Sequence, residues 1–517
     1  MTRGEIASVM PPSPSHPTTL LDLLHSIPAD QIAVIDPEQN VRLTYGALRR
    51  QVQSVAEVLS AAGIERGDRI GMALPNGIPT IVAFLAASVA GTAAPLNPGY
   101  KEDEFSFYLD DTRAKVLLLP PDGAPEARKA AAGRVPVIGV EMDGAGEVTL
   151  AGMPRGKPVQ APALDDVALI LHTSGSTGRP KRVPLSHANL TISAGNVARS
   201  YALTAADVSL CVMPLFHVHG LVASTLATLC TGGTIVVPAK FNPLSFWRIV
   251  RDHRVTWYSA VPTLHQLLLA RVARSGAPEK PEGAEQLRFI RSCSASLPPQ
   301  VMRDLESAFG APVLEAYGMT EAAHQMASNP LPPGPRVPGS VGPGTDVRIS
   351  IMDEQGRHLP QGERGEVVIQ GPNVIRGYEN NPEANATSFV DGWFRTGDQG
   401  FLDERGYLTL VGRLKELINR GGEKISPREI DEVLLTHPAI AEAVCFGVPH
   451  PTWGEEVSAA VVLHGAASEA ELLGFCKERL ADFKRPKQIH ITDAIPRTAT
   501  GKIQRRVVAQ VFGPKPS

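Results

Sequence analysis

The sequence predicts an α/β protein with a large N-terminal domain, made of layered α/β subdomains plus a β-rich subdomain, and a small mobile α+β C-terminal domain. The chain has 517 residues, 43% of them hydrophobic, which is more than one compact core usually holds. Over the first four hundred residues, short β-branched runs alternate with segments of helical spacing, a pattern typical of partly parallel sheets. After Val411 the pattern becomes that of a small α+β unit. We therefore expect domains at 1–411 and 412–517, with a hinge near Lys415.

Residue spacing locates individual elements of both domains. Apolar Leu48, Val52 and Leu59 repeat with helical period, which predicts a helix over 45–63. β-Branched and aliphatic runs predict strands at 114–119, 233–237 and 366–369. A loop rich in Pro and Gly at 329–338 precedes the predicted β-rich subdomain at 341–410. In the C-terminal domain, helices are predicted at 427–436 and 469–480 and strands at 441–448 and 459–463.

One apolar stretch, 78–96, approaches the length that crosses a bilayer. Pro79, Gly91 and Pro95 interrupt it, and no basic cluster beside it supplies an orientation signal. We therefore expect a buried core helix here and no integral membrane segment.

Charge and cysteine content exclude several classes of protein. The formal net charge is -3, so the chain has no overall basic field for nucleic acid or an anionic membrane. The five cysteines are scattered, odd in number and outside any metal-type cluster. The N-terminus lacks the pattern of a signal peptide and the C-terminus does not read Ser-Lys-Leu. A reducing, cytoplasmic location is expected.

The segment from Leu169 to Lys181 is an apolar strand that enters a loop of hydroxyls and glycines and ends on a lysine. Small residues let backbone N–H groups approach phosphate oxygens, and Lys181 adds a cation for the outer phosphates. The loop is not a Walker A motif, because Pro180 precedes the lysine and Arg182 follows it. A flexible Ser/Gly turn is the alternative reading. The expected phosphate-binding residues are Thr173, Ser174, Gly175, Ser176, Thr177, Gly178 and Lys181.

This loop resembles the phosphate-binding signature of the adenylate-forming superfamily of acyl-CoA synthetases, luciferases and peptide-synthetase adenylation domains. The family's loop usually continues Pro-Lys-Gly, so Arg182 departs from it. Tyr-Gly-Met-Thr-Glu at 317–321 is a second match, although an isolated segment of this kind could equally be a capped helix start. The resemblance implies that Tyr317 contacts the nucleotide, Thr320 the α-phosphate and Glu321 a Mg²⁺ ion. A carboxylate beside a triphosphate does need an intervening cation.

Further segments follow in the family's order along most of the chain. By this resemblance Asp398 accepts both ribose hydroxyls, Arg413 lies toward the ribose and Lys415 is the pivot of a domain rotation. A carboxylate has the two acceptor oxygens that a ribose diol needs, although a lone Thr-Gly-Asp is usually a turn. The loop that borders the CoA channel corresponds to Gly421, Gly422 and Glu423.

Lys502 corresponds to the family's catalytic lysine of the first half-reaction. When a carboxylate attacks the α-phosphorus, negative charge grows on the attacking and leaving groups, and a bridging cation is most effective there. By itself, a lysine near Arg505 and Arg506 would be read as a solvated residue of a basic tail. Its position after the other motifs favours the catalytic role.

The resemblance implies a two-step ligase. A carboxylate and ATP give acyl-AMP and pyrophosphate, the C-terminal domain then rotates about Lys415, and CoA thiolate displaces AMP. The implied cofactors are ATP, Mg²⁺ and CoA, and the partners are small molecules. We expect a monomer or a homodimer.

The acid is argued from the pocket residues. Polar side chains near the acyl site favour a small polar acid, because a second carboxylate buried without donors would cost roughly several kcal/mol. His217 and His219 could suggest a metal pair, but no third ligand is apparent. The motifs around these residues resemble those of plant and fungal oxalyl-CoA synthetases. That resemblance implies an oxalate site lined by His217, Ser292, Ser294 and His324.

Three other functions stay open at this stage. The acid could be a short- or medium-chain fatty acid, and the enzyme could load a carrier protein instead of CoA. A non-catalytic nucleotide-binding homologue is the third possibility. Its weakness is that the chain keeps the complete set of family positions, namely Lys181, Glu321, Asp398, Arg413 and Lys502.

Overall fold

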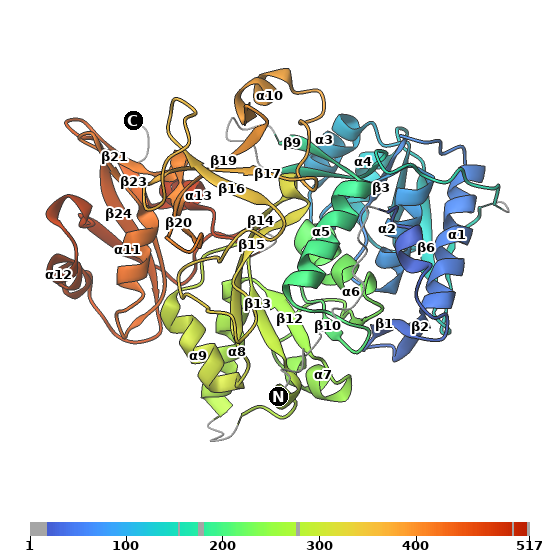
Figure 1. Ribbon diagram of the computed structural model, residues 1–517, viewed down its shortest axis with the longest axis horizontal. Coiled ribbons are helices and arrows are strands. Elements are labelled where there is room, and N and C mark those ends of the chain that lie inside the picture. The colour runs from blue at the N-terminus through green and yellow to red at the C-terminus, as the bar shows by residue number, and fades with distance from the viewer. Residues whose placement is uncertain (1–17, 154–155, 174–179, 276–279, 499–500, 514–517) are drawn as a thin grey trace, which may run out of the picture.

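The computed structural model describes residues 18–153, 156–173, 180–275, 280–498 and 501–513. Figure 1 shows α/β layers at one end of the molecule, a β-rich part next to them, and a small α+β unit at the other end. Four sheets organise the described residues. The predicted fold class is confirmed.

The first α/β layer is a seven-stranded sheet in the order β7-β6-β5-β3-β4-β8-β9. Its strands run parallel from β6 to β8, while β7 and β9 are antiparallel edges. Leu118 packs against the core under α1 and α2, whereas Leu117 and Leu119 pack with α3 and α4, so helices cover both faces. The elements are α1 (Tyr45–Ala61), α2 (Ile78–Ala90), α3 (Glu102–Thr112), α4 (Pro125–Ala131), β3 (Arg69–Met72), β4 (Thr92–Pro95), β5 (Val116–Leu119), β6 (Val137–Met142), β7 (Val148–Leu150), β8 (Val167–Thr173) and β9 (Lys181–Ser186).

Two helix predictions fall in this layer. The helix expected over 45–63 is confirmed as α1. The buried helix expected over 78–96 is wrong beyond Ala90, because the chain turns at Gly91 into strand β4. The turn is tightly packed: a Cβ on Gly91 would lie 2.7 Å from the carbonyl oxygen of Asp68. An apolar helix and a buried strand in direct succession therefore read as one long apolar segment.

The second layer is an eight-stranded sheet in the order β15-β14-β13-β12-β10-β11-β1-β2. All neighbours from β14 to β1 are parallel, and β15 and β2 are antiparallel edges. The strand predicted at 233–237 is its β11. The elements are β1 (Ile32–Asp36), β2 (Val41–Thr44), β10 (Val208–Leu210), β11 (Thr234–Val236), β12 (Trp257–Ala260), β13 (Phe289–Ser292), β14 (Val313–Met319), β15 (His324–Ser328), α5 (His187–Ser200), α6 (Ala227–Leu229), α7 (Phe246–Asp252), α8 (Pro262–Ser275), α9 (Pro299–Phe309), the π-helical η2 (His219–Leu226), and the 3-10 turns η1 (Asp22–Leu24), η3 (Ala284–Gln286) and η4 (Thr320–Ala322).

The predicted β-rich subdomain forms a five-stranded antiparallel sheet beside these layers. Its strand β17 contains the predicted strand at 366–369. Strand β20 of this sheet ends next to β14. Two motifs that are distant in the sequence therefore lie close together. The elements are β16 (Arg348–Met352), β17 (Gly365–Gln370), β18 (Phe389–Val390), β19 (Trp393–Leu402), β20 (Leu408–Arg413) and α10 (Pro382–Ser388).

The C-terminal unit has a five-stranded sheet and two hydrophobic clusters of its own. Each predicted helix and strand is present within a few residues of its expected bounds. The domain boundary at 411 and the hinge near Lys415 stay predictions. The elements are η5 (Leu414–Glu416), β21 (Ile418–Arg420), β22 (Glu423–Ile425), α11 (Pro427–Leu434), β23 (Ile440–His450), β24 (Gly454–Leu463), α12 (Glu469–Arg479), η6 (Asp482–Lys484), β25 (Gln488–Ile491) and α13 (Arg505–Phe512).

Two general findings bear on function. Within the described ranges, none of the helices combines the length and apolar character needed to cross a bilayer. The parallel strands β12, β13 and β14 end at one edge of the second sheet. The carboxyl edge of such a sheet is where α/β proteins bind ligands, and the candidate residues gather there.

Candidate active site

Thr173 and Lys181 are cross-strand partners at the ends of β8 and β9. The loop between them therefore joins two antiparallel strands, whereas a Walker A loop would lead into a helix. Its predicted phosphate contacts at Ser174, Gly175, Ser176, Thr177 and Gly178 lie outside the described residues. Lys181 Nζ lies 4.4 Å from the centre of the Tyr378 ring. Burial lowers the pKa of Lys181, and the charge of Glu321 partly opposes this effect.

Arg182, the residue that departs from the family pattern, anchors the exit of this loop. Its guanidinium donates to the carbonyl of Asp111, and its Nε lies 3.4 Å from Asp111 Oδ2. Its own carbonyl accepts the backbone N–H of Glu379 at 3.1 Å. The Glu379 carboxylate in turn accepts from Arg69 at 2.8 Å. Arg182 thus ties β9 to α3 and to the segment around Glu379.

Glu321 is held at the carboxyl edge by Tyr378, whose hydroxyl donates to Glu321 Oε1 at 2.8 Å. Glu321 and Thr320 are each 6% exposed and lie in η4, directly after β14. Mg²⁺ is usually bound by one or two carboxylates together with substrate phosphates and water. A single buried carboxylate close to Lys181 is therefore a donor set that fits this ion.

Asp398 connects the β-rich sheet to the second α/β layer. Arg413 Nε lies 2.8 Å from Asp398 Oδ1, and the Tyr317 hydroxyl donates to Asp398 Oδ2. Burial raises the pKa of Asp398, while the Arg413 charge opposes the rise. The structure therefore brings together three residues that the sequence assigned to nucleotide binding.

The Lys502 turn reaches this edge from the C-terminal domain. The Lys502 N–H donates to Thr498 Oγ1 at 3.1 Å, and Arg497 bonds Glu442 at 2.6 Å. Burial lowers the pKa of Lys502, but Cys293 and the carboxylates Asp398 and Glu321 favour its charged form. A cavity of about 400 Å³ lies between this turn and the N-terminal domain, bordered among others by Met213, Phe216, Thr498 and Gly501.

The predicted acid pocket is a cluster of histidine and serine side chains. His219 Nδ1 lies 3.0 Å from Ser294 Oγ, and the rings of His219 and His324 have centroids 5.2 Å apart. Ser292, the last residue of β13, is 1% exposed, and its hydroxyl has no hydrogen-bond partner among the described residues. Ser294 has a φ of 73°, an uncommon value for a residue with a side chain. The unpartnered Ser292 hydroxyl is free to contact a ligand.

Burial keeps the histidines of this pocket neutral. Burial and then Lys502 lower the pKa of His217 to about 3. Burial, followed by the charge of Arg291, lowers the pKa values of His219 and His324 well below the ordinary value. Near neutral pH each ring therefore has one N–H donor and one acceptor nitrogen.

Three residues beside the site were missed by sequence reasoning: Ser259, Arg291 and Tyr378. Arg291 is fully buried and lies 3.4 Å from His324, measured from Nη2 to Nδ1. A charged residue inside the apolar run at 289–292 was a signal that could have found it. Ser259 and Tyr378 have no comparable local signal, because their partners are distant in the sequence.

The predicted hinge and CoA residues lie apart from the acid pocket. Lys415 is in η5, close enough for its charge to lower the pKa of Lys181. Gly421 and Gly422 form the turn between β21 and β22, with φ values of 60° and 93°, and Glu423 begins β22. Figure 1 shows β21 on the outer side of the C-terminal unit, away from β14. In this arrangement Lys502, not the glycine turn, faces the site.

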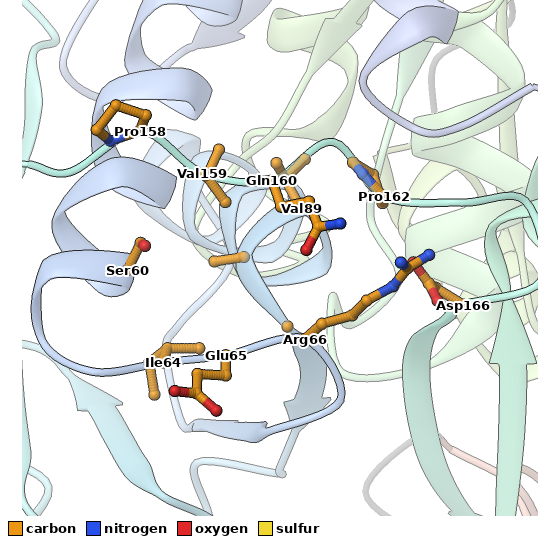
Figure 2. A pocket seen from close by; sticks show the side chains of 12 residues that line it. Ser60, Ile64, Glu65, Arg66, Val89, Pro158, Val159, Gln160, Pro162 and Asp166 are labelled. Atoms are coloured by element: carbon orange, nitrogen blue, oxygen red, sulfur yellow. The ribbon is translucent and has the colours of Figure 1, made fainter.

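Two other features do not add to the site. The described residues contain no group of three or more His, Cys, Asp or Glu side chains that could hold a metal. A separate cavity of about 390 Å³ lies near the ends of α1 and α2. Figure 2 shows its Arg66 directed at Asp166, with which it forms an ion pair. None of the candidate site residues lines this cavity.

Comparison with known families agrees with the arrangement of motifs. The sequence pattern of the AMP-binding enzymes matches residues 25–379, and that of the AMP-binding enzyme C-terminal domain matches residues 429–502. A probable CoA ligase, CCL9, of Humulus lupulus is 49% identical, with 91% of each chain covered. The oxalate–CoA ligase of Arabidopsis thaliana is 48% identical, over 92% of this chain and 94% of that protein.

Solved structures share the whole architecture. ATP-bound MatB of Rhodopseudomonas palustris is 33% identical and superimposes with a TM-score of 0.87, over 96% of this chain and 98% of that one. O-Succinylbenzoate coenzyme A synthetase of Bacillus subtilis, in complex with ATP and magnesium ion, is 30% identical. It superimposes with a TM-score of 0.82, over 94% of this chain and 98% of that one.

Proposed function

The chain belongs to the AMP-binding enzymes and is an AMP-forming acid:CoA ligase, and on this basis we propose that the acid it activates is oxalate. ATP and CoA are its other substrates. A cytoplasmic location is part of the proposal, and the five cysteines, all free, suit a reducing compartment.

The observation that carries the choice of acid is the polar lining at the ends of β13 and β14. Ser292, His324 and the Ser294–His219 pair replace the apolar wall that an alkyl or aromatic tail would bury against. An oxalate molecule has a second carboxylate next to the reacting one, and that group needs donors when it is buried. The unpartnered Ser292 hydroxyl is one such donor. Similarity to the Arabidopsis thaliana oxalate–CoA ligase supports the same choice.

The first half-reaction joins the acid to AMP. We assign the ribose to Asp398 and Arg413, the adenylate to Tyr317 and Thr320, and the β- and γ-phosphates to Lys181. A Mg²⁺ ion held by Glu321 and phosphate oxygens would neutralise part of the triphosphate charge. One oxalate oxygen forms a bond to the α-phosphorus while the bond to pyrophosphate breaks. Lys502 stabilises the charge on both groups in that transition state.

The second half-reaction requires Lys502 to leave. Its turn closes one side of the 400 Å³ cavity, so withdrawal of the turn opens a path toward the acyl carbonyl. We propose that rotation about Lys415 does this and moves Gly421, Gly422 and Glu423 toward the CoA thiol. CoA sulfur then bonds to the acyl carbon, and AMP leaves with the former acid oxygen.

The proposal is tested by coupled AMP release with a panel of acids at fixed ATP, Mg²⁺ and CoA. Oxalate is expected to give the highest kcat/KM, and oxalyl-CoA should be identified by mass spectrometry. Comparable turnover of a medium-chain fatty acid with none of oxalate would refute the choice of acid. Transfer to a carrier protein without formation of a free CoA thioester would refute the acceptor.

A further inference from the structure

Arg291, on β13, is a fully buried cation whose hydrogen-bond partners among the described residues are all uncharged. It donates to the Tyr201 hydroxyl at 2.8 Å from Nε, to Ser259 Oγ at 2.9 Å from Nη1, and to Gln325 Oε1 at 3.0 Å from Nη2. None of the ion pairs among the described residues includes it. A buried charge without a counter-ion is costly and is normally found paired. Its position behind the acid pocket therefore needs an explanation.

The guanidinium fixes the direction of a hydrogen-bond chain, because it can only donate. Ser259 Oγ accepts from Arg291 and lies 2.7 Å from His219 Nε2. Ser259 is fully buried, and that nitrogen is the only acceptor its hydroxyl contacts among the described residues. His219 therefore accepts at Nε2 and has its proton on Nδ1, which donates to Ser294 Oγ at 3.0 Å. The Ser294 hydroxyl accepts from His219 and therefore keeps its own proton for donation to another group.

A second branch sets His324 in the same way. Arg291 Nη2 lies 3.4 Å from His324 Nδ1, so that nitrogen faces a donor and must be the acceptor. The His324 proton is then on Nε2, at the far side of the ring. The two branches leave different ring nitrogens as donors, yet both start from one guanidinium.

We propose that Arg291 is a positioning residue that sets the tautomers of His219 and His324, so that their chains present only N–H and O–H donors to the acid pocket. The pocket then selects an acid that has a second carboxylate. This inference rests on the proposed oxalate activity for its substrate, but the tautomers themselves do not depend on it.

The charges around the two rings agree with neutral histidines. Arg291, His217 and Lys502 face both rings, and His265 also faces His219. Every one of these groups disfavours an added positive charge. A neutral imidazole with a fixed proton is the form that can both accept from Arg291 and donate to a ligand.

The direct test is nitrogen NMR of the full-length enzyme with selectively ¹⁵N-labelled histidine. In the wild type, His219 should be neutral with its proton on Nδ1 and His324 neutral with its proton on Nε2. Ser259→Ala should change the His219 signals and leave His324 as it was, whereas Arg291→Met should change both. Tyr201→Phe is the matched control, since it removes a buried partner of Arg291 but neither branch, and both tautomers should persist.

The kinetic test uses the same variants. Ser259→Ala should raise the KM for oxalate by about 10-fold, as expected for one lost donor to a charged group, with kcat and the KM for ATP changed less than about 3-fold. The Ki of glyoxylate, a monoanion of similar size, should hardly change. Tyr201→Phe should leave the ratio of the KM for oxalate to the Ki of glyoxylate unchanged.

Several outcomes would overturn the inference. A wild-type His219 protonated on Nε2, or unchanged tautomers in both Ser259→Ala and Arg291→Met, would contradict the positioning role. Changed tautomers with an unchanged KM for oxalate would contradict the selection of a second carboxylate. If the wild type does not activate oxalate at all, the proposed function fails while the NMR result still decides the role of Arg291.

Discussion

Asp398 and Arg413 face each other as cross-strand partners on β19 and β20, with Arg413 Nε 2.8 Å from Asp398 Oδ1. The pairing holds the carboxylate beside the Tyr317 hydroxyl, which donates to its second oxygen. Two strands of the β-rich sheet thus hold the Asp398 carboxylate in a fixed orientation at the edge of another sheet. Such an arrangement suits recognition of a ribose diol, because the ligand finds its acceptors already oriented.

Asp398→Asn should weaken ATP binding more than it weakens the fold. The amide loses an acceptor and leaves Arg413 without its carboxylate, so we expect the KM for ATP to rise by about 10- to 100-fold. Steady-state kinetics with varied ATP measures this. Asp207→Asn is the control, since Asp207 is a buried carboxylate that pairs with Arg288 at 2.5 Å next to a different sheet, just before β10 and β13. An equal rise in both variants would mean that Asp398 acts only through stability.

Arg182→Gly, which restores the residue usual in the family, should destabilise this enzyme. Arg182 joins β9 to Asp111 and lies beside Glu379. Removal of this largely buried cation takes a positive charge away from both carboxylates. We expect a loss of about 1–3 kcal/mol in unfolding free energy. Denaturant unfolding measures the loss. Arg66→Ala, which removes a more exposed ion pair with Asp166, should lower the unfolding free energy by less than Arg182→Gly does. An unchanged unfolding free energy in Arg182→Gly would show that the contacts of Arg182 are dispensable for stability.

Glu315, on β14, should make stability depend on pH. Burial raises the pKa of Glu315 from 4.5 to about 7, with the Gly339 N–H, which donates at 3.0 Å, opposing the rise. Because the folded pKa lies above the unfolded one, the folded state holds the proton more tightly. The contribution is complete below pH 4.5 and is lost as the pH rises through 7.

Glu315→Gln should remove that dependence, since the amide is neutral at every pH. The wild type should lose about 3 kcal/mol relative to this variant between pH 4.5 and 7.5. The difference between the two melting curves at each pH isolates Glu315 from groups of opposite sign, such as His187, whose pKa burial lowers to about 4. A constant difference across this range would contradict the prediction.

Sequence reasoning predicted the candidate site from residues that belong to local motifs. Thr173, Lys181, Asp398 and Lys502 belong to short segments whose order along the chain is itself informative. The structure brings Lys181 and Lys502 near Glu321, and Lys502 near Asp398. The fold class followed in the same way, from periodicity and the alternation of elements. The helix at 78–96 was overextended because a buried strand and a buried helix have the same apolar composition.

Contacts between distant segments could not be predicted. Arg291 is 34 residues from Gln325 and 90 from Tyr201 in the sequence, and these partners meet only because β13 lies inside the sheet. Ser259 and Tyr378 are ordinary residues until folding places them against His219 and Glu321. Tertiary packing, not local pattern, decides such roles.

Lys502→Ala should block adenylate formation and spare the thioester step. The bridging charge is needed while the α-phosphorus is attacked, so pyrophosphate exchange should fall by about 10²- to 10³-fold. CoA thioester formation from supplied acyl-AMP should stay within a few-fold of the wild type. Arg506→Ala, an exposed basic residue nearby in the sequence, should affect neither step. If both half-reactions survive in Lys502→Ala, the lysine has no catalytic role.

Lys415→Pro should have the opposite effect on the two half-reactions. Lys415 lies in the 3-10 turn η5, which begins directly after Arg413. Proline fixes the φ angle of its residue, and this backbone angle would have to change during a rotation about Lys415. Proline is tolerated in the first turn of a helix, so the arrangement with Lys502 at the site should survive. Pyrophosphate exchange should therefore continue, while thioester formation from acyl-AMP falls by at least about 10-fold. Lys415→Ala keeps the backbone free and should retain the thioester step, so loss of that step in both variants would point to the side chain and not to rotation.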